Sequence, residues 1–278
     1  MLGISPSTYY DQPSTQVDRD AQAIQDLLAA HTEHRLYGVR RLKVELGWNT
    51  KKTRRIRTLA RLVIERASKK RRTGKATAPE IPAPANALRP FAVFKDAARP
   101  QDGMSYASMT ESGGWVQDFT YLWVNRSWVY LAVVLDLKTR QVMGWSLGLS
   151  HSSELTYRAV LDALSKHAPP TILHSDQGSE YLSMRHEQLC ARFNMILSCS
   201  AKASPWQNGF MERFFETIQL ELGPLTKFAG LAELHEGIAL AIHYYNTKRI
   251  HTAFDMPPAT YAATLIQERE LVSGIWGA

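Results

Sequence analysis

The sequence is 278 residues long, with 45% hydrophobic and 21% charged residues, an ordinary composition for a globular protein of one or two domains. No apolar stretch is long enough to cross a bilayer and no signal-peptide pattern opens the chain, so we expect no membrane contact. The two cysteines, Cys190 and Cys199, lack the spacing of zinc ligands and favour a reducing cytoplasm.

The net charge of +7 is distributed unevenly along the chain. Residues 1–75 contain 17 Lys and Arg against 7 Asp and Glu, a balance of +10, and the remaining residues have a balance of −3. This asymmetry indicates a nucleic-acid-binding region attached to a second, nearly neutral part. A basic helical surface that is merely solvated is the alternative interpretation.

Three short helices are predicted in the N-terminal part. Residues 16–34 and 34–46 have apolar positions at helical spacing, and Thr50 is the expected N-cap of a third helix over residues 51–64. The closely spaced arginines of the third helix favour a helix-turn-helix-like DNA-binding region over residues 1–66; an unspecialised basic hairpin is the alternative. The expected apolar positions are Ile24, Leu27, Leu28, Val39, Leu42, Leu46, Ile56, Leu59, Leu62 and Val63.

Residues 67–113 read as a basic, Pro- and Ala-rich linker whose basic start would lie along phosphates. From Gly114 onward the pattern changes to strands. Residues 114–124, 127–139 and 141–149 predict an antiparallel meander, and helices then alternate with strands at residues 169–176 and 195–200. This order predicts an α/β fold of ribonuclease H type, a five-stranded mixed sheet with flanking helices over residues 114–266, followed by a tail at 267–278.

Three acidic residues stand out in the predicted α/β region. Asp118 lies on the first strand, Asp176 ends the fourth strand, and Glu212 lies on a later helix. A fourth strand beside the first would bring the two aspartates together, and carboxylates so close would repel each other unless a cation intervened. Two Mg²⁺ ions about 3.5–4 Å apart would accept such oxygen ligands and support phosphoryl transfer on DNA. Each acid alone is as easily structural, as we expect for Asp136, and Glu216 and Glu221 read as exposed helix charges.

Several segments of this chain resemble the second reading-frame product of the insertion-sequence-3 family of DDE transposases, which has a retroviral-type integrase core. The core segments are "DFTYL", "HSDQGSEY" and "SPWQNGFMERFFETI", with 35 residues between Asp176 and Glu212. "LGISPSTYY" and "LYGVRRL" resemble the family's opening and helix-turn-helix segments, and "YYNTKRIHTAFDMPPATYA" resembles its closing segment.

The resemblance implies that Asp118, Asp176 and Glu212 form a metal-binding catalytic triad that uses two Mg²⁺ ions, with Mn²⁺ able to substitute. The reaction it implies is cleavage at a transposon end by water, followed by attack of the freed 3′-hydroxyl on another phosphodiester. Further matching positions are His174, Gly178, Tyr181, Asn208 and Gly209. For each of His174, Trp206, Arg249 and His251, a substrate contact and a purely structural role both stay open.

The family often has a basic residue seven positions after the glutamate, where this chain has Gln219, and Lys202 or Arg213 would replace that DNA contact. The partners implied are double-stranded DNA of terminal inverted repeats and targets, further copies of the chain, and an upstream reading-frame product. The expected location is the bacterial cytoplasm, on the nucleoid when DNA is bound. The expected DNA-contacting residues are Arg40, Arg41, Lys51, Lys52, Arg54, Arg55, Arg57, Arg61, Lys69, Lys70, Arg71, Arg72, Lys202 and Arg213.

Two other functions compete with transposition. A regulator that retains an inactive core would bind DNA without cutting it, although the intact acids argue against this. A structure-selective nuclease of ribonuclease H type would cut DNA without joining it.

Overall fold

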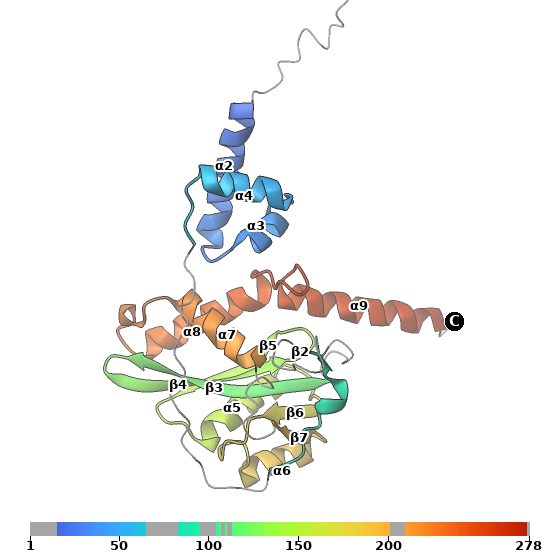
Figure 1. Cartoon of the computed structure of the whole chain (residues 1–278). Helices are drawn as coiled ribbons and strands as arrows, with labels where there is room; N and C mark the ends of the chain where they lie inside the picture. Colours follow the sequence, from blue (N-terminus) through green and yellow to red (C-terminus); the bar gives the residue numbers. More distant parts are fainter. Residues whose placement is uncertain are drawn as a thin grey trace, which may run out of the picture. The chain divides into compact units, whose positions relative to one another are not determined.

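The computed structural model describes residues 16–64, 83–94, 104–106, 109, 113–200 and 209–276. The chain divides into two compact units (Figure 1). The helical unit contains Met1–Arg66 and Ile250–Asp255, and the sheet unit contains Ala67–Arg249 and Met256–Ala278. Several predicted contact residues lie outside the described ranges: Lys69, Lys70, Arg71, Arg72, Lys202, Trp206 and Asn208.

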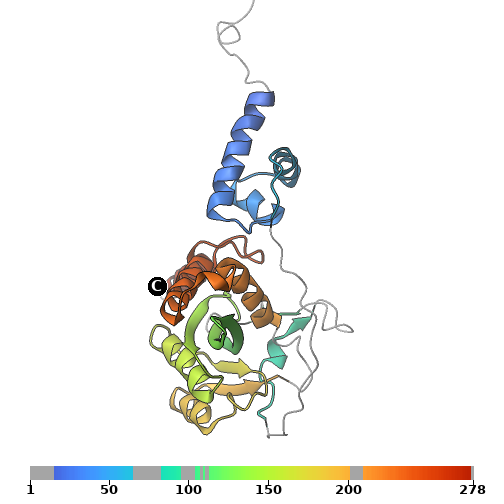
Figure 2. The same ribbon diagram turned by 90° about the vertical axis from the view of Figure 1, so that its left-hand side faces the viewer.

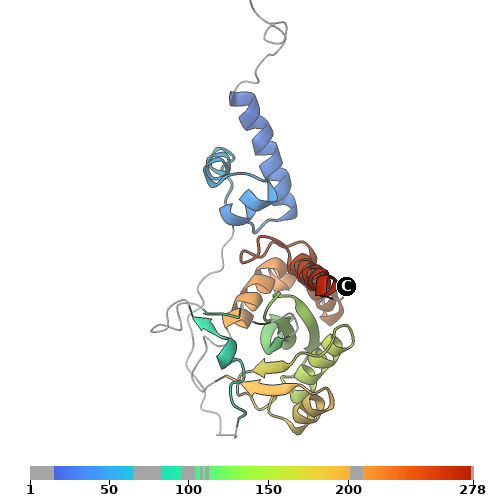
Figure 3. The same cartoon turned by 90° about the vertical axis from the view of Figure 1, so that its right-hand side faces the viewer.

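The helical unit consists of α2 (Gln16–Glu33), α3 (Val39–Glu45) and α4 (Thr50–Leu59), which confirms the three predicted helices (Figure 3). Each helix presents one apolar stripe, and these stripes pack together into one small core. The loop before α3 contributes Tyr37 to the same core. This core contains Leu27, Tyr37, Leu42, Ile56 and, from the distant C-terminal segment, Ile250.

The predicted end positions of α4 were partly wrong. The N-cap is Asn49, not Thr50, because the Asn49 side chain accepts a hydrogen bond from the backbone N–H of Lys52. The helix stops at Leu59, and Arg61 then takes a positive φ of 51°, which turns the chain away. Leu59 and Val63 are therefore exposed instead of lying in the core.

The sheet unit is built on a five-stranded mixed sheet in the order β5-β4-β3-β6-β7. Its antiparallel part is β3 (Gly114–Val124), β4 (Ser127–Asp136) and β5 (Val142–Gly148), and β6 (Ile172–Ser175) and β7 (Ile196–Cys199) continue it in parallel. The predicted ribonuclease H-like class is thereby confirmed. A separate antiparallel pair, β1 (Val93–Phe94) and β2 (Met104–Ser105), precedes it.

Helices cover both faces of the sheet (Figure 2). On one face, α5 (Ser153–Leu164) and α6 (Met184–Arg192) bury side chains against the strands. The approach of α5 is so close that a Cβ on Gly144 of β5 would lie 2.3 Å from the backbone nitrogen of Ala163. Leu161 of α5 is exposed.

The opposite face of the sheet is covered by α7 (Gly209–Leu222) and α8 (Leu231–Thr247), and both bury apolar residues in the larger core. In the part of the chain that the structure describes, 3₁₀ turns lie at Arg89–Phe91 and Leu225–Lys227. The sequence prediction missed α9 (Pro258–Trp276), which continues well past the expected domain end at residue 266. Within the described ranges, none of the helices combines the length and apolarity needed to pass through a bilayer.

Candidate active site

Strand pairing brings Asp118 and Asp176 to the same level of the sheet. The parallel register of β3 and β6 pairs Val116 with His174. Asp118 comes two residues after Val116, and Asp176 comes two residues after His174. Alternation along β3 directs Asp118 to the face of Val116, Leu122 and Val124, which is the face covered by α7. The sequence expectation that a fourth strand beside the first would unite the two aspartates agrees with this topology.

Glu212 lies in the first turn of α7, and its side chain is exposed. Buried Phe214 and Ile218 fix the rotation of the helix against the sheet. Further along, the Gln219 amide donates a hydrogen bond of 3.3 Å to the Thr120 hydroxyl on β3. The residue that replaces the expected basic side chain therefore ties α7 to the strand that carries Asp118.

Electrostatic repulsion links the acids of this site. Burial raises the pKa of Asp118 well above its usual range, and the charges of Asp176, Glu180 and Glu212 raise it further. Asp176 remains accessible to solvent, yet partial burial raises its pKa as well, while a hydrogen bond from the Gly178 N–H lowers it. A buried carboxyl group whose ionised form is disfavoured by burial and by neighbouring carboxylates makes a site that a cation would stabilise.

The donor set of this site suits a hard divalent cation, because it consists of carboxylate oxygens. Among the residues that the structure describes, however, no three His, Cys, Asp or Glu side chains lie close enough together to share one ion. The charge of Glu212 acts on Asp118 despite this separation, and Glu212 has the longest of the three side chains and is exposed. A change in the side-chain rotamer of Glu212 is the smallest movement that would narrow the gap.

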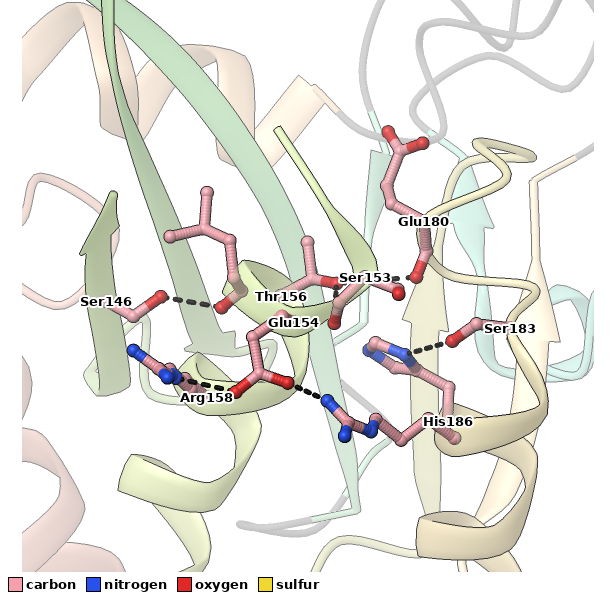
Figure 4. Close-up of polar contacts among 10 residues, drawn as sticks. Ser146, Ser153, Glu154, Thr156, Arg158, Glu180, Ser183 and His186 are labelled. Carbon is pink, nitrogen blue, oxygen red and sulfur yellow. Dashed lines mark hydrogen bonds and ion pairs between the residues drawn. The ribbon is translucent and has the colours of Figure 1, made fainter. Parts of the chain in front are cut away.

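The loop after β6, which carries Asp176, is anchored at several points. The Asp176 carboxylate accepts a hydrogen bond of 2.9 Å from the Gly178 N–H, and the Gln177 amide donates to the Ser200 carbonyl. Figure 4 shows two anchors from the helices: Thr156 of α5 contacts the Glu180 carbonyl, and Ser183 pairs with the His186 ring. These contacts fix the backbone on which Asp176 and Glu180 sit.

Glu180 is a feature of the site that sequence reasoning missed, and Tyr181 was expected only as a matching motif position, without a role for its hydroxyl. In Figure 4 the Glu180 carboxylate points away from Thr156, and its charge raises the pKa of Asp118. Tyr181 is fully buried, and burial together with the charge of nearby Asp118 raises its pKa. The signal was present, because both residues lie inside the segment "HSDQGSEY".

His174 is a buried structural residue in this structure. Its ring nitrogens lie 2.8 Å from the Ser198 hydroxyl and 3.0 Å from the Ser200 hydroxyl, so it joins β6 to β7 and the following residue. Burial lowers the pKa of His174 to about 4, which keeps the ring neutral at pH 7. Of the two roles left open for His174, these contacts favour local hydrogen bonding.

Among the basic residues expected on DNA, Arg57 donates a hydrogen bond of 3.4 Å to the Leu62 carbonyl, and three others have shorter contacts inside the helical unit. Arg40 donates to the Thr252 carbonyl at 2.6 Å, and Arg41 donates to the Ile250 carbonyl at 2.8 Å. Arg55 forms a bidentate ion pair with Asp20 of α2. These contacts give the three arginines a structural role in holding the unit together.

Other basic residues of the helical unit lie on the surface of α4 and the turn after it. Arg54, Arg57 and Arg61 line a pocket of about 590 Å³, together with Val39, Thr58, Leu62 and Val63. Lys51 is exposed, and the Lys52 ammonium lies 4.2 Å from the centre of the Trp48 ring. In the sheet unit, Arg213 is 81% exposed beside Glu216.

Other expectations concern residues with contacts inside the folded units. Asp136 is buried and accepts hydrogen bonds from the Thr139 N–H and hydroxyl, which confirms its structural role. Glu221 was wrongly expected to be an exposed charge, because it pairs with buried Arg249 at 3.1 Å. His251 stacks on Phe254 within the helical unit.

Two protein-family models match the sheet unit and its C-terminal continuation. Both are described as "Integrase core domain", and they cover residues 110–205 and residues 194–258. The first match contains Asp118 and Asp176, and the second contains Glu212.

Several curated proteins are similar to this chain. A transposase for insertion sequence element IS904 of Lactococcus lactis is 35% identical over 51% of this chain and 57% of its own length. The insertion element IS600 uncharacterized 31 kDa protein of Shigella sonnei is 28% identical over 94% of this chain and 96% of its own. Transposase InsF for insertion sequence IS3A of Escherichia coli is 37% identical over 38% of each chain. The matched region thus spans little more than half of the Lactococcus relative and less than half of InsF.

Solved structures with a similar chain path include viral integrase cores. The magnesium complex of the HTLV-2 integrase catalytic core covers 54% of this chain and 96% of its own, with 19% identity and a TM-score of 0.45. The catalytic core domain of BIV integrase covers 58% and 99%, with 20% identity and a TM-score of 0.46.

Proposed function

We propose that this chain, which belongs to the insertion-sequence-3 family of DDE transposases, cuts DNA at the ends of an insertion sequence and joins them to target DNA. The observation that carries the proposal is that Asp118 on β3 and Asp176, in the residue directly after the adjacent parallel strand β6, lie close enough for the charge of Asp176 to raise the pKa of Asp118. Burial of Asp118 beside the charges of Asp176, Glu180 and Glu212 would be a cost to folding without a cationic ligand or a function that needs it.

Asp118, Asp176 and Glu212 would hold divalent metal, expected to be two Mg²⁺ ions, with Mn²⁺ as a substitute. Bound metal would supply charge compensation for the attacking and leaving oxygens of the phosphodiester. The protein's own contribution would be to hold Asp118 on β3, Asp176 in the anchored loop directly after β6, and Glu212 on a helix packed over the sheet. No protein nucleophile is required, because water and then a DNA 3′-hydroxyl attack the phosphorus.

The helical unit would hold the terminal repeat DNA through phosphate contacts from the basic surface of α4. The described residues best placed to contact phosphates lie on α4 and the turn after it: Lys51, Lys52, Arg54, Arg57 and Arg61. In the sheet unit, Arg213 lies beside Glu212 and is the proposed contact near the acidic site. The proposed partners are target DNA, further copies of the chain and an upstream reading-frame product. Further copies would be needed because two transposon ends must be brought together. The protein would act in the bacterial cytoplasm, on the nucleoid when DNA is bound.

A strand-joining assay tests this function. Purified protein, alone and fused to the upstream reading-frame product, would be incubated with labelled transposon ends and plasmid DNA in Mg²⁺ or Mn²⁺. We expect labelled ends to become covalently joined to the plasmid. Cleavage without joining would indicate the nuclease alternative, and binding without cleavage would indicate the regulator.

A further inference from the structure

Arg140 is a buried cation close to the start of α7. It lies in the turn between β4 and β5, with a φ of 63° and only 8% of its surface exposed. Its backbone N–H donates to the Asp136 carbonyl at 2.9 Å, which closes the turn. The turn therefore aims the Arg140 side chain into the protein instead of into solvent.

The Arg140 guanidinium packs on an aromatic ring of α7. Its central carbon lies 3.5 Å from the centre of the Phe210 ring, and the Tyr106 ring lies 5.8 Å from the same ring. Phe210 is the second residue of α7 and comes two residues before Glu212. The stack thus holds the first helical turn, from which the Glu212 carboxylate projects.

Packing alone does not explain why a cation occupies this position. Burying a guanidinium is costly, and an apolar side chain would fill the space at lower cost. Among the described residues, the buried Nη1 of Arg140 has no hydrogen-bond partner, and the guanidinium lies on the Phe210 ring face while the Asp136 charge acts on it electrostatically. A flat cation on an aromatic face restricts both groups to one geometry, which an aliphatic contact would not do.

We propose that Arg140 is a positioning residue for the metal site, which fixes the first turn of α7 through Phe210 and so sets the reach of Glu212 toward Asp118. This inference rests on the proposed function, because it assigns Glu212 to a divalent cation. It adds a residue outside the three acids and outside the motifs that suggested them.

The test has two measurements on the full-length chain. Electron paramagnetic resonance measures Mn²⁺ affinity in the absence of DNA, and a strand-joining assay measures how the rate of joining depends on the Mg²⁺ concentration. Arg140→Lys keeps the charge and loses the planar stack, and Phe210→Leu removes the ring and keeps the arginine. We expect each to weaken Mn²⁺ binding about tenfold and to raise the Mg²⁺ midpoint of joining in parallel. The double variant should bind Mn²⁺ no more weakly than the worse single variant, because both changes break one contact.

Arg126→Lys is the matched control, because Arg126 also has a φ of 63° in a hairpin turn but is exposed. It should bind Mn²⁺ within about twofold of the unaltered chain. Unchanged Mn²⁺ affinity in both Arg140→Lys and Phe210→Leu, with activity lost only in proportion to unfolded protein, would overturn the inference and leave the proposed function intact. If the unaltered chain neither binds Mn²⁺ nor joins DNA, both are overturned.

Discussion

Asp118 and Asp176 each follow a paired residue of two adjacent parallel strands by two positions, so their carboxyl groups emerge at one level of the sheet. Local hydrogen bonds hold both: Asp118 accepts from the Phe119 N–H at 2.8 Å and Asp176 from the Gly178 N–H at 2.9 Å. This pair is the fixed part of the proposed metal site, and the longer Glu212 is its adjustable part.

The burial of Asp118, together with the charges of neighbouring acids, predicts a stability effect that depends on pH. Its pKa is raised in the folded protein, so the folded state holds the proton more tightly than the unfolded chain. Stability from this group is full below the ordinary carboxyl pKa and is lost as the pH rises through the raised value. We expect metal-free Asp118→Asn to be more stable than the unaltered chain at pH 8, by about 1 kcal/mol or 2–4 °C, with no gain at pH 4.

Calorimetry at both pH values, repeated with Mg²⁺, measures this effect. Mg²⁺ should raise the melting temperature of the unaltered chain and leave Asp118→Asn unchanged. A loss of stability in Asp118→Asn at pH 8 would mean that the carboxylate stabilises the fold and is not under repulsion.

Two buried histidines predict acid lability. Burial lowers the pKa of His174 and of His186 to about 4, so the unfolded chain takes up protons first as the pH falls. Stability is therefore full above the ordinary histidine pKa and is lost between about pH 6.5 and 4, by roughly 3 kcal/mol for each ring. Urea unfolding at pH 7 and pH 5 should show this slope, reduced in His174→Gln.

The same substitution at exposed His243 on α8 is the control and should keep the full slope. An equal slope in His174→Gln and the unaltered chain would show that His174 does not titrate in this window.

The contacts in the helical unit predict that some of its arginines bind DNA and that others stabilise the fold. Arg54 and Arg61 are exposed beside the pocket of α4, whereas Arg55 is paired with Asp20. Arg54→Ala and Arg61→Ala should each weaken DNA binding several-fold and reduce the salt slope of log Kd by about one. Arg55→Ala should leave that slope unchanged and lower the melting temperature instead. Fluorescence anisotropy over a salt series measures the slopes, and an equal drop for Arg55→Ala would contradict this division.

The distant segment Ile250–Asp255 predicts a further stability effect. The buried N–H of Ile250 donates a hydrogen bond of 2.6 Å to the Tyr37 hydroxyl. Tyr37→Phe leaves this N–H without a partner and should cost about 1–3 kcal/mol of unfolding free energy. Chemical denaturation followed through the helical unit checks this, with Tyr121→Phe at a 61% exposed position as a control that should cost little. Equal stability of the two variants would contradict the assigned hydrogen bond.

Local pattern was sufficient to predict most elements of this fold. Alternation around Asp118 and the short apolar run before Asp176 predicted their strands, and standard connection rules suggested the antiparallel meander with the fourth strand beside the first. The same reasoning missed α9, because its apolar residues do not gather into one stripe, and it misplaced the cap of α4, where Asn49 is the stronger acceptor.

Long-range pairings were beyond reach of the sequence pattern. Nothing near Arg41 in the chain indicates Ile250, and nothing near Glu221 indicates Arg249, because each pair joins segments that meet only in the folded unit. The same holds for Arg140 and Phe210. Sequence reasoning therefore interpreted charged helix residues as exposed or DNA-facing, although some of them form contacts that stabilise the folded unit.

Replacement of one metal ligand by a softer one tests the central claim most directly. Asp176→Cys should lose strand joining in Mg²⁺, which prefers oxygen ligands, and recover part of it in Mn²⁺, which accepts a thiolate more readily. Asp176→Asn should show no joined product in either ion while binding transposon-end DNA as tightly as the unaltered chain. Strand joining by Asp176→Asn in Mg²⁺ at a rate close to that of the unaltered chain would contradict a catalytic metal site at this carboxylate.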